Sequence, residues 1–246
     1  MMLAGKRVLV TGGGSGVGAD LARGFARAGA EVVIAGRRIE ALQAVASDAD
    51  GIRAVAGDVT DETAVAGLFD TAGPCDIVIA NAGAAESMAF GKMTLDHWNA
   101  MLAVNLTGTF LTFREGLRRM PGAGRLIAVA SVAGLKGYPY VAAYAAAKHG
   151  VVGLVRALGE EVAGRGITVN AICPGYLDTE MTARTLANIG AKTGRSVEDA
   201  RAALERQSPQ RRLFEPGEVT GTALWLCSDA ARGINGQAIA IAGGAP

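Results

Sequence analysis

The chain has few of the residues that support disulfide, metal-binding or strongly electrostatic functions. Its 246 residues include three cysteines and two histidines, and its formal net charge is +1. Cys75, Cys173 and Cys227 lie far apart without a CxxC pair, which predicts free thiols in a reducing compartment and no metal site. The near-neutral charge argues against an electrostatic partner such as nucleic acid or an anionic membrane surface.

Long hydrophobic runs are also lacking. No stretch approaches the roughly 20 continuous apolar residues of a membrane span. The N-terminus, MMLAGKRVLVTGGG, does not have a signal-peptide layout, because its apolar run is short and glycines follow at once. We therefore expect a cytoplasmic protein with no membrane partner. Aromatics make up 5% of the chain, whereas 35 residues are glycine, which predicts tight turns and closely packed helices.

Short apolar runs alternate with longer helical patterns along the whole chain. Strands are predicted at 7–11, 31–35, 52–57, 76–80, 125–131, 167–173 and 237–242, and helices at about 16–29, 39–49, 61–72, 95–120, 142–164 and 215–228. The strands are apolar on both faces, as in a parallel sheet that helices cover on both sides. The pattern predicts an α/β fold with a doubly wound, seven-stranded parallel sheet in a single domain spanning 1–246.

One polar, largely helical segment, at about 176–214, interrupts this alternation between the sixth strand and the last helix. Excursions of this kind at the carboxyl edge of a sheet often close over a ligand. We expect this segment to form a substrate lid.

A glycine-rich turn, TGGGSGVG at 11–18, directly follows the first predicted strand and opens a helix. Gly12, Gly16 and Gly18 would allow positive φ angles and let a pyrophosphate approach the backbone, where the helix N-terminus supplies free N–H groups. A merely tight strand–helix turn is the alternative. No GK[ST] follows, which excludes a P-loop. The pattern indicates a dinucleotide site in a Rossmann fold.

The end of the second strand indicates which dinucleotide binds. Gly36 stands where an acidic residue would hold the ribose 2′-hydroxyl of NAD, and Arg37 and Arg38 follow. Because a guanidinium grips a phosphate in bidentate fashion, NADP(H) is favoured, while NAD(H) stays open. Ser15 counts against this prediction, because the glycine turn then offers no second basic residue to a phosphate. Both arginines could instead be solvated charges at the start of the next helix.

Three tyrosines lie close together in KGYPYVAAYAAAKHG at 136–150. Tyr144 and Lys148 are four apart in an alanine-rich helical stretch and therefore share a face. Pro139 separates Tyr140 from Lys136, so that pair cannot share a helical face. A phenol needs a neighbouring ammonium to titrate near neutral pH, and we expect Lys148 to lower the pKa of Tyr144.

Two further polar residues stand near this pair in the predicted topology. Ser131 ends the fifth strand at the ligand-binding edge, where it could orient a substrate oxygen or simply cap a turn. Asn105 lies within a long apolar helix pattern, where an amide is costly unless it is satisfied or functional.

These motifs, in this order and spanning nearly the whole chain, resemble the short-chain dehydrogenase/reductase family. TGGGSGVG fits T-G-x-x-x-G-x-G, and CPGYLDTEM fits P-G-x-x-x-T. The motif N-N-A-G appears as ANAG, with Ala80 replacing the first Asn. The similarity is to members such as 3-oxoacyl carrier-protein reductases and secondary-alcohol dehydrogenases.

The resemblance implies roles for a larger set of residues. Asp58 would bind the adenine amino group with Val59 beside the ring, and Thr179 would contact the nicotinamide carboxamide or the phosphates. Asp58 could alternatively cap the following helix, a task for which Thr60 is better suited. The full predicted cofactor-binding set is Gly12, Gly14, Ser15, Gly16, Val17, Gly18, Arg37, Asp58, Val59, Asn81, Ala82, Gly83, Tyr144, Lys148, Pro174, Gly175, Leu177 and Thr179.

The implied activity is hydride transfer between nicotinamide and a ketone or secondary alcohol. Tyr144 would be the acid/base, Lys148 would lower its pKa and hold the nicotinamide ribose, Ser131 would position the substrate oxygen, and Asn105 would hold a water of the proton relay. The enoyl-reductase branch typically spaces its Tyr and Lys seven apart, and Val151 stands at that position. A non-catalytic dinucleotide-binding protein and a methyltransferase are weaker alternatives.

The substrate stays open at this level. Basic residues of the segment 176–214 would suit a 3-oxoacyl thioester on an anionic carrier, and its apolar residues would suit a cyclic or aromatic alcohol. Tyr138 and Tyr176 are candidate pocket walls. The helices near 95–120 and 142–164 pair between subunits in relatives, which predicts a homotetramer.

Overall fold

The computed structural model describes residues 1–245, without the side chains at 192 and 193. Its centre is one seven-stranded parallel sheet with the order β3-β2-β1-β4-β5-β6-β7. The strands are β1 (Arg7–Thr11), β2 (Glu31–Gly36), β3 (Ile52–Ala56), β4 (Ile77–Ala80), β5 (Arg125–Val129), β6 (Thr168–Pro174) and β7 (Ala238–Ile241). The predicted fold class is confirmed. Pro246 lies outside the described residues, and the single-domain assignment stays a prediction.

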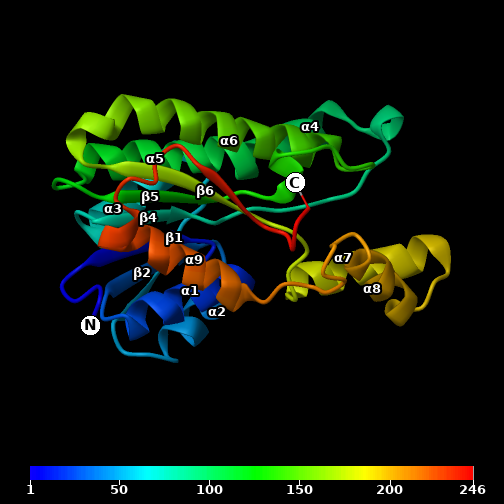
Figure 1. Cartoon of the computed structure of the whole chain (residues 1–246), viewed down its shortest axis with the longest axis horizontal. Helices are drawn as coiled ribbons and strands as arrows, with labels where there is room; N and C mark the ends of the chain where they lie inside the picture. The colour runs from blue at the N-terminus through cyan, green and yellow to red at the C-terminus, as the bar shows by residue number, and fades with distance from the viewer. Residues whose placement is uncertain (246) are drawn as a thin grey trace.

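The first three strands extend the sheet in one direction from β1. The chain then returns to the other side of β1, where β4 pairs with it and the later strands follow. Crevices for ligands form at such switch points, outside the carboxyl ends of the strands. In Figure 1 these ends point toward the lid helices, so the whole carboxyl edge faces one region.

Helices cover both faces of the sheet (Figure 1). They are α1 (Gly16–Arg27), α2 (Ile39–Ala46), α3 (Glu62–Ala72), α4 (Leu95–Leu102), α5 (Gly108–Arg119), α6 (Ala142–Val162), α7 (Glu180–Thr193), α8 (Val197–Glu205) and α9 (Pro216–Cys227). One apolar core lies between the sheet and α1, α2 and α9, and a second lies between the sheet and α3, α5 and α6. Strands that are buried on both faces account for the continuous apolar runs in the sequence.

Local signals explain most helix boundaries, with one correction. Thr60 was expected to cap the helix after β3, but Asp61 is the N-cap of α3 and accepts hydrogen bonds from the amides of Thr63 (2.8 Å) and Ala64 (3.0 Å). The Asp58 carboxylate instead accepts from the Thr60 amide and hydroxyl, both at 2.9 Å. Helix α6 begins at Ala142, after the Pro139 break, as predicted.

The long helix predicted at 95–120 is divided. Helix α4 continues into a π-helical segment, η2 (Ala103–Thr107), before α5 begins at Gly108. Such π-turns frequently mark functional sites. At Gly108 a Cβ atom would lie 2.8 Å from a methyl carbon of Val59, so glycine allows α5 to approach the strand–helix loop after β3.

The segment predicted as a lid contains α7 and α8, which project beyond the carboxyl edge of the sheet (Figure 1). Its two ends are joined by a parallel bridge between Leu177 and Phe214. The Phe214 amide donates to the Tyr176 carbonyl at 2.9 Å, and the Asp178 amide donates to the Phe214 carbonyl at 2.8 Å. The two ends of the segment are therefore held to each other.

Within residues 1–245 we find no helix with the length and apolar character that crossing a bilayer requires. In the same range, no group of three or more His, Cys, Asp or Glu is placed to hold a metal ion. The cysteines are unpaired; Cys75 and Cys173 are buried and Cys227 is half-buried.

Candidate active site

The glycine turn between β1 and α1 forms a close backbone cradle. Gly12 and Gly16 have φ angles of +70° and +51°, and a Cβ atom at Gly18 would lie 2.1 Å from the Gly12 carbonyl oxygen. The N-cap, Ser15, is extended, and none of the described side chains caps the first turn of α1 or places an acid there. The free N–H groups of this turn suit a pyrophosphate, so the residues fit the predicted dinucleotide.

Thr11 and Asn81 join this cradle to the loop after β4. The Asn81 Nδ2 donates to the carbonyls of Thr11 (3.0 Å) and Gly12 (3.2 Å), while the amides of Asn81 and Ala82 donate to the Thr11 Oγ1 at 3.1 and 3.2 Å. Thr11 was not among the predicted site residues. Its place as the first residue of the T-G-x-x-x-G-x-G motif was the available signal.

Two exposed arginines follow the end of β2. Arg37 and Arg38 are exposed, and neither makes an ion pair with any part of the chain that the structure describes. Asp58 lies nearby after β3, and its carboxyl pKa is lowered chiefly by the hydrogen bond from the Thr60 amide, with a smaller contribution from Arg37. This arrangement leaves two guanidinium groups available where a ribose phosphate would lie.

The P-G loop after β6 approaches the glycine cradle from the other side. The Gly175 amide donates to the Ile241 carbonyl at 2.9 Å, and the Thr179 methyl group lies 3.6 Å from the position of a Cβ on Gly16. Leu177 is 9% exposed and packs in the core, so only its backbone is available to a cofactor. The predicted loops thus border one crevice.

Tyr144 and Lys148 lie one turn apart on α6, as the spacing predicted. The Lys148 ammonium is 5.6 Å from the centroid of the Tyr144 ring and donates to the Val129 carbonyl at 2.9 Å. The Ser131 Oγ accepts a hydrogen bond from the Ala133 amide at 3.1 Å, and the Ser131 side chain also hydrogen-bonds Tyr144. The turn-capping role of Ser131 is observed, and its role in orienting a substrate oxygen stays a prediction.

The protonation of this pair differs from the sequence-based prediction. Lys148 was expected to lower the pKa of Tyr144, but burial raises the pKa of Tyr144, with the Ser131 hydrogen bond opposing the rise. Burial also lowers the pKa of Lys148 to about 8. Desolvation disfavours both charged forms because atoms from several elements surround both groups. Without a bound cofactor, the Tyr144 phenol therefore stays protonated and can donate a proton.

Asn105 is fully buried in the π-helical segment, and its side-chain amide is engaged with backbone. Nδ2 donates to the carbonyls of Ala84 (2.9 Å) and Met101 (3.0 Å), and Oδ1 accepts from the Ala84 amide at 3.3 Å. A Cβ atom at Gly83 would lie 2.8 Å from this Oδ1. The amide ties η2 to the loop after β4, so a water-holding role for these side-chain atoms stays a prediction without support from their contacts.

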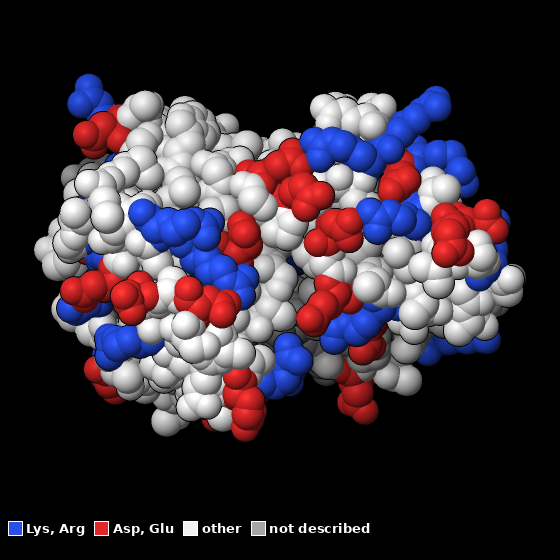
Figure 2. Space-filling view, turned by 90° about the horizontal axis from the view of Figure 1, so that it is seen from below, with Lys and Arg blue, Asp and Glu red and all other residues white. Residues whose placement is uncertain are grey.

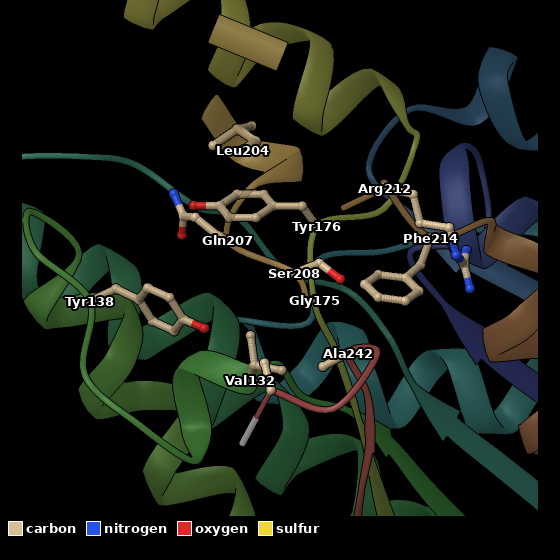
Figure 3. Close-up of a pocket in the computed structure, with 11 residues that line it drawn as sticks. Val132, Tyr138, Gly175, Tyr176, Leu204, Gln207, Ser208, Arg212, Phe214 and Ala242 are labelled. Atoms are coloured by element: carbon tan, nitrogen blue, oxygen red, sulfur yellow. The ribbon is translucent and has the colours of Figure 1, made fainter. Parts of the chain in front are cut away.

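A pocket opens between the body of the protein and the lid (Figure 3); its lining includes Val132, the residue after Ser131, and Tyr176, which interacts electrostatically with Tyr144. Tyr138 and Tyr176 line it, as anticipated. Tyr140 is not part of its described lining; it is exposed, with φ of +67°, and its carbonyl accepts from the Met88 amide at 2.7 Å. The sequence analysis did not single out the other lining residues, which are Val132, Leu204, Gln207, Ser208, Arg212, Phe214, Ala242 and Ala245, with Gly175 between them.

Known proteins match this architecture over nearly its whole length. A family model described as enoyl-(acyl carrier protein) reductase matches residues 12–246. The chain is 34% identical to the 3-oxoacyl-[acyl-carrier-protein] reductase FabG of Aquifex aeolicus, over 98% of both proteins. The chain belongs to the short-chain dehydrogenase/reductase family.

Two further members of the family are similar at the same level. A cis-4-hydroxycyclohexanecarboxylate dehydrogenase of Sinomonas cyclohexanicum is 39% identical, over 98% of this chain and 96% of the relative. The crystal structure of an actinorhodin polyketide ketoreductase variant with NADPH has a TM-score of 0.91 and 32% identity, over 97% and 96% of the two chains. This short-chain dehydrogenase/reductase is an NAD(P)-dependent oxidoreductase that acts on CH–OH groups.

Proposed function

We propose that this enzyme interconverts a ketone and a secondary alcohol with NADP(H), using Tyr144 as the acid/base. The observation that carries the proposal is the convergence of Ser131, Tyr144 and Lys148, with the Lys148 ammonium 3.7 Å from the position of a Cβ on Gly83 in the loop after β4. When bound, the nicotinamide supplies a hydride to the carbonyl carbon or accepts one from the alcohol carbon. In reduction, the Tyr144 O–H bond breaks and its proton goes to the carbonyl oxygen, so that one hydride and one proton are added.

The neighbouring groups prepare this proton transfer. The Ser131 hydroxyl, held by Ala133, orients the substrate oxygen toward the phenol. Lys148, fixed on the Val129 carbonyl, would hold the nicotinamide ribose together with Tyr144, and Asn105 would support the relay by fixing η2 and the Ala84 backbone. The lid, 176–214, would exclude water from the reacting atoms.

The cofactor preference rests on Arg37 and Arg38, which make no ion pair within the described chain, although Arg37 interacts at longer range with Asp58. The similar actinorhodin ketoreductase was crystallised with NADPH. We place the 2′-phosphate of NADP(H) at Arg37, with NAD(H) as the poorer cofactor.

The assay for this function follows nicotinamide absorbance during ketone reduction, with NADPH and NADH as alternative cofactors. Arg37→Ala is expected to lower kcat/KM for NADPH by about 10- to 100-fold, because a charge-assisted hydrogen bond to the phosphate is lost. The kcat/KM for NADH should stay unchanged. Arg232→Ala, an exposed arginine near the opposite edge of the sheet, is the matched control. A wild-type preference for NADH would contradict the assignment.

A second candidate, reduction of an enoyl thioester, is favoured by the description of the matching family model. At the position seven after Tyr144, where that branch typically carries its lysine, Val151 is fully buried in the core, so no ammonium is available there. Oxidation of NADPH by an enoyl thioester, but not by any ketone, would favour this candidate over the first.

We also propose a homotetramer in a reducing, cytoplasmic environment. Leu95 and Phe110, on α4 and α5, are 72% and 41% exposed, and Trp225 on α9 is 44% exposed. Burial of these two apolar regions against other copies would form two kinds of dimer contact. Light scattering is expected to give about four times the chain mass of 25.0 kDa, and a monomeric mass would refute the tetramer.

A further inference from the structure

The pocket beside the proposed catalytic residues has polar side chains, but they are neutral. Tyr138, Tyr176, Gln207 and Ser208 are distributed around it, among apolar residues such as Val132 and Leu204. Burial raises the pKa of both Tyr138 and Tyr176, which keeps the two phenols protonated. Figure 3 shows Tyr138 on the body side and Tyr176 with Gln207 on the lid side.

Arg212 is the one arginine or lysine among the pocket-lining residues that the structure describes, and its charge is already paired. Its Nη1 and Nη2 donate to the Glu218 carboxylate at 2.6 and 2.9 Å, and its Nε donates to the Gln210 Oε1 at 3.0 Å. The guanidinium also lies 4.5 Å from the ring centroid of Phe214 and points away from the cavity (Figure 3). It is therefore not available to bind a substrate anion.

Two other cations near the pocket, Arg201 and Lys136, also have partners, whereas Arg206 and Arg211 are exposed and lie outside the pocket lining. Arg201 of α8 donates to Asp178 at 2.6 Å and to Glu205 at 3.0 Å. The Lys136 ammonium lies 5.2 Å from the ring centroid of Tyr138, outside the pocket lining. On the face shown in Figure 2, basic and acidic side chains alternate over the lid side of the molecule. The lid thus shows no single-signed surface on this face to attract an anionic carrier.

The pocket is also small. Its free volume of about 20 Å³ holds little more than one water molecule, so only a compact substrate suits it. Three aromatic rings, from Tyr138, Tyr176 and Phe214, border this space and present faces and edges to a bound ring.

On the basis of the proposed function, we propose that the substrate is a compact, uncharged ring ketone or the corresponding secondary alcohol, and that Gln207 helps to select it against carboxylates. A carboxylate in this pocket would lose hydration without gaining a free cation, whereas a neutral amide, ester or hydroxyl could pair with Gln207 or a phenol. Gln207 is exposed, at the lid side of the pocket, so its substitution does not disturb the core.

The test compares two substrates with the same ring, 4-oxocyclohexanecarboxamide and 4-oxocyclohexanecarboxylate, in NADPH-dependent reduction. The carboxamide is expected to have a kcat/KM about 10- to 100-fold higher, as expected for one charged group left unpaired. Gln207→Lys should raise the ratio of carboxylate to carboxamide kcat/KM by about fivefold, because it adds a cation at the pocket. Asn188→Lys, an exposed position on α7 outside the pocket, should leave this ratio unchanged.

The outcomes distinguish a failure of the proposed ketone reduction from a failure of the proposed selection for neutral substrates. If neither these compounds nor a wider set of ketones is reduced, the proposed function fails. If the wild type reduces the carboxylate as well as or better than the carboxamide, ketone reduction stands and the inferred selection for neutral substrates is wrong. Normal carboxamide reduction would show that Gln207→Lys is folded. An unchanged ratio of carboxylate to carboxamide kcat/KM in that variant would show that Gln207 does not contribute to substrate selection.

Discussion

Tyr144→Phe is expected to lower kcat for ketone reduction by about 1000-fold, within the usual range for loss of a general acid. The ring that packs in the site is kept, and only the hydroxyl that hydrogen-bonds Ser131 is removed. Tyr144 is one of two groups proposed to hold the nicotinamide ribose, while the glycine cradle and Arg37 lie on other elements, so the Kd for NADPH should rise by no more than about fivefold. Single-turnover nicotinamide absorbance measures the first quantity, and quenching of intrinsic fluorescence measures the second.

Tyr140→Phe is the matched control for this experiment. Tyr140 lies four residues before Tyr144, and its side chain is 66% exposed. Its backbone carbonyl accepts a hydrogen bond from the Met88 amide, which the substitution keeps. Its kcat should equal that of the wild type. Wild-type reduction rates in Tyr144→Phe would show that the proton comes from another group, and the acid/base assignment would fall.

Lys148→Met is expected to abolish most activity and at the same time to stabilise the folded protein near pH 7. Burial lowers the pKa of Lys148 from its usual 10.5 to about 8. Between these two values the unfolded chain binds more protons than the folded one, so stability rises with pH across this window. Below about pH 8 the amine is charged in both states, and the full destabilisation from burying the ammonium is present. Removing the amine should raise the free energy of unfolding at pH 7 by about 2 kcal/mol, after loss of the Val129 hydrogen bond.

Denaturant unfolding at pH 7 and pH 10 measures this difference. The stabilisation by Lys148→Met should be largest at pH 7 and should diminish toward pH 10. Lys92→Met, at an exposed lysine, should show no such pH dependence. Equal or lower stability of Lys148→Met at pH 7 would show that burial of the charged amine does not destabilise the folded protein.

Much of the fold could be predicted because its signals are local. Strands that are buried on both faces must be apolar at every position, and β1 begins and ends at the predicted residues. Helix α6 could be placed because Pro139 cannot lie within it, and the spacing of Tyr144 and Lys148 follows from the helical repeat. The division of the helix at 95–120 was missed, since a π-turn leaves the apolar pattern nearly intact.

The sequence by itself determined the order of elements, the glycine turn and the identity of the Tyr144–Lys148 pair, because each depends on neighbours within a few residues. Only the tertiary structure decided how distant residues act together. Thr11 contacts Asn81, 70 residues later, because the ends of β1 and β4 lie side by side in the sheet. The direction of the Tyr144 pKa was likewise not readable from spacing, since it depends on burial by surrounding elements rather than on Lys148 alone.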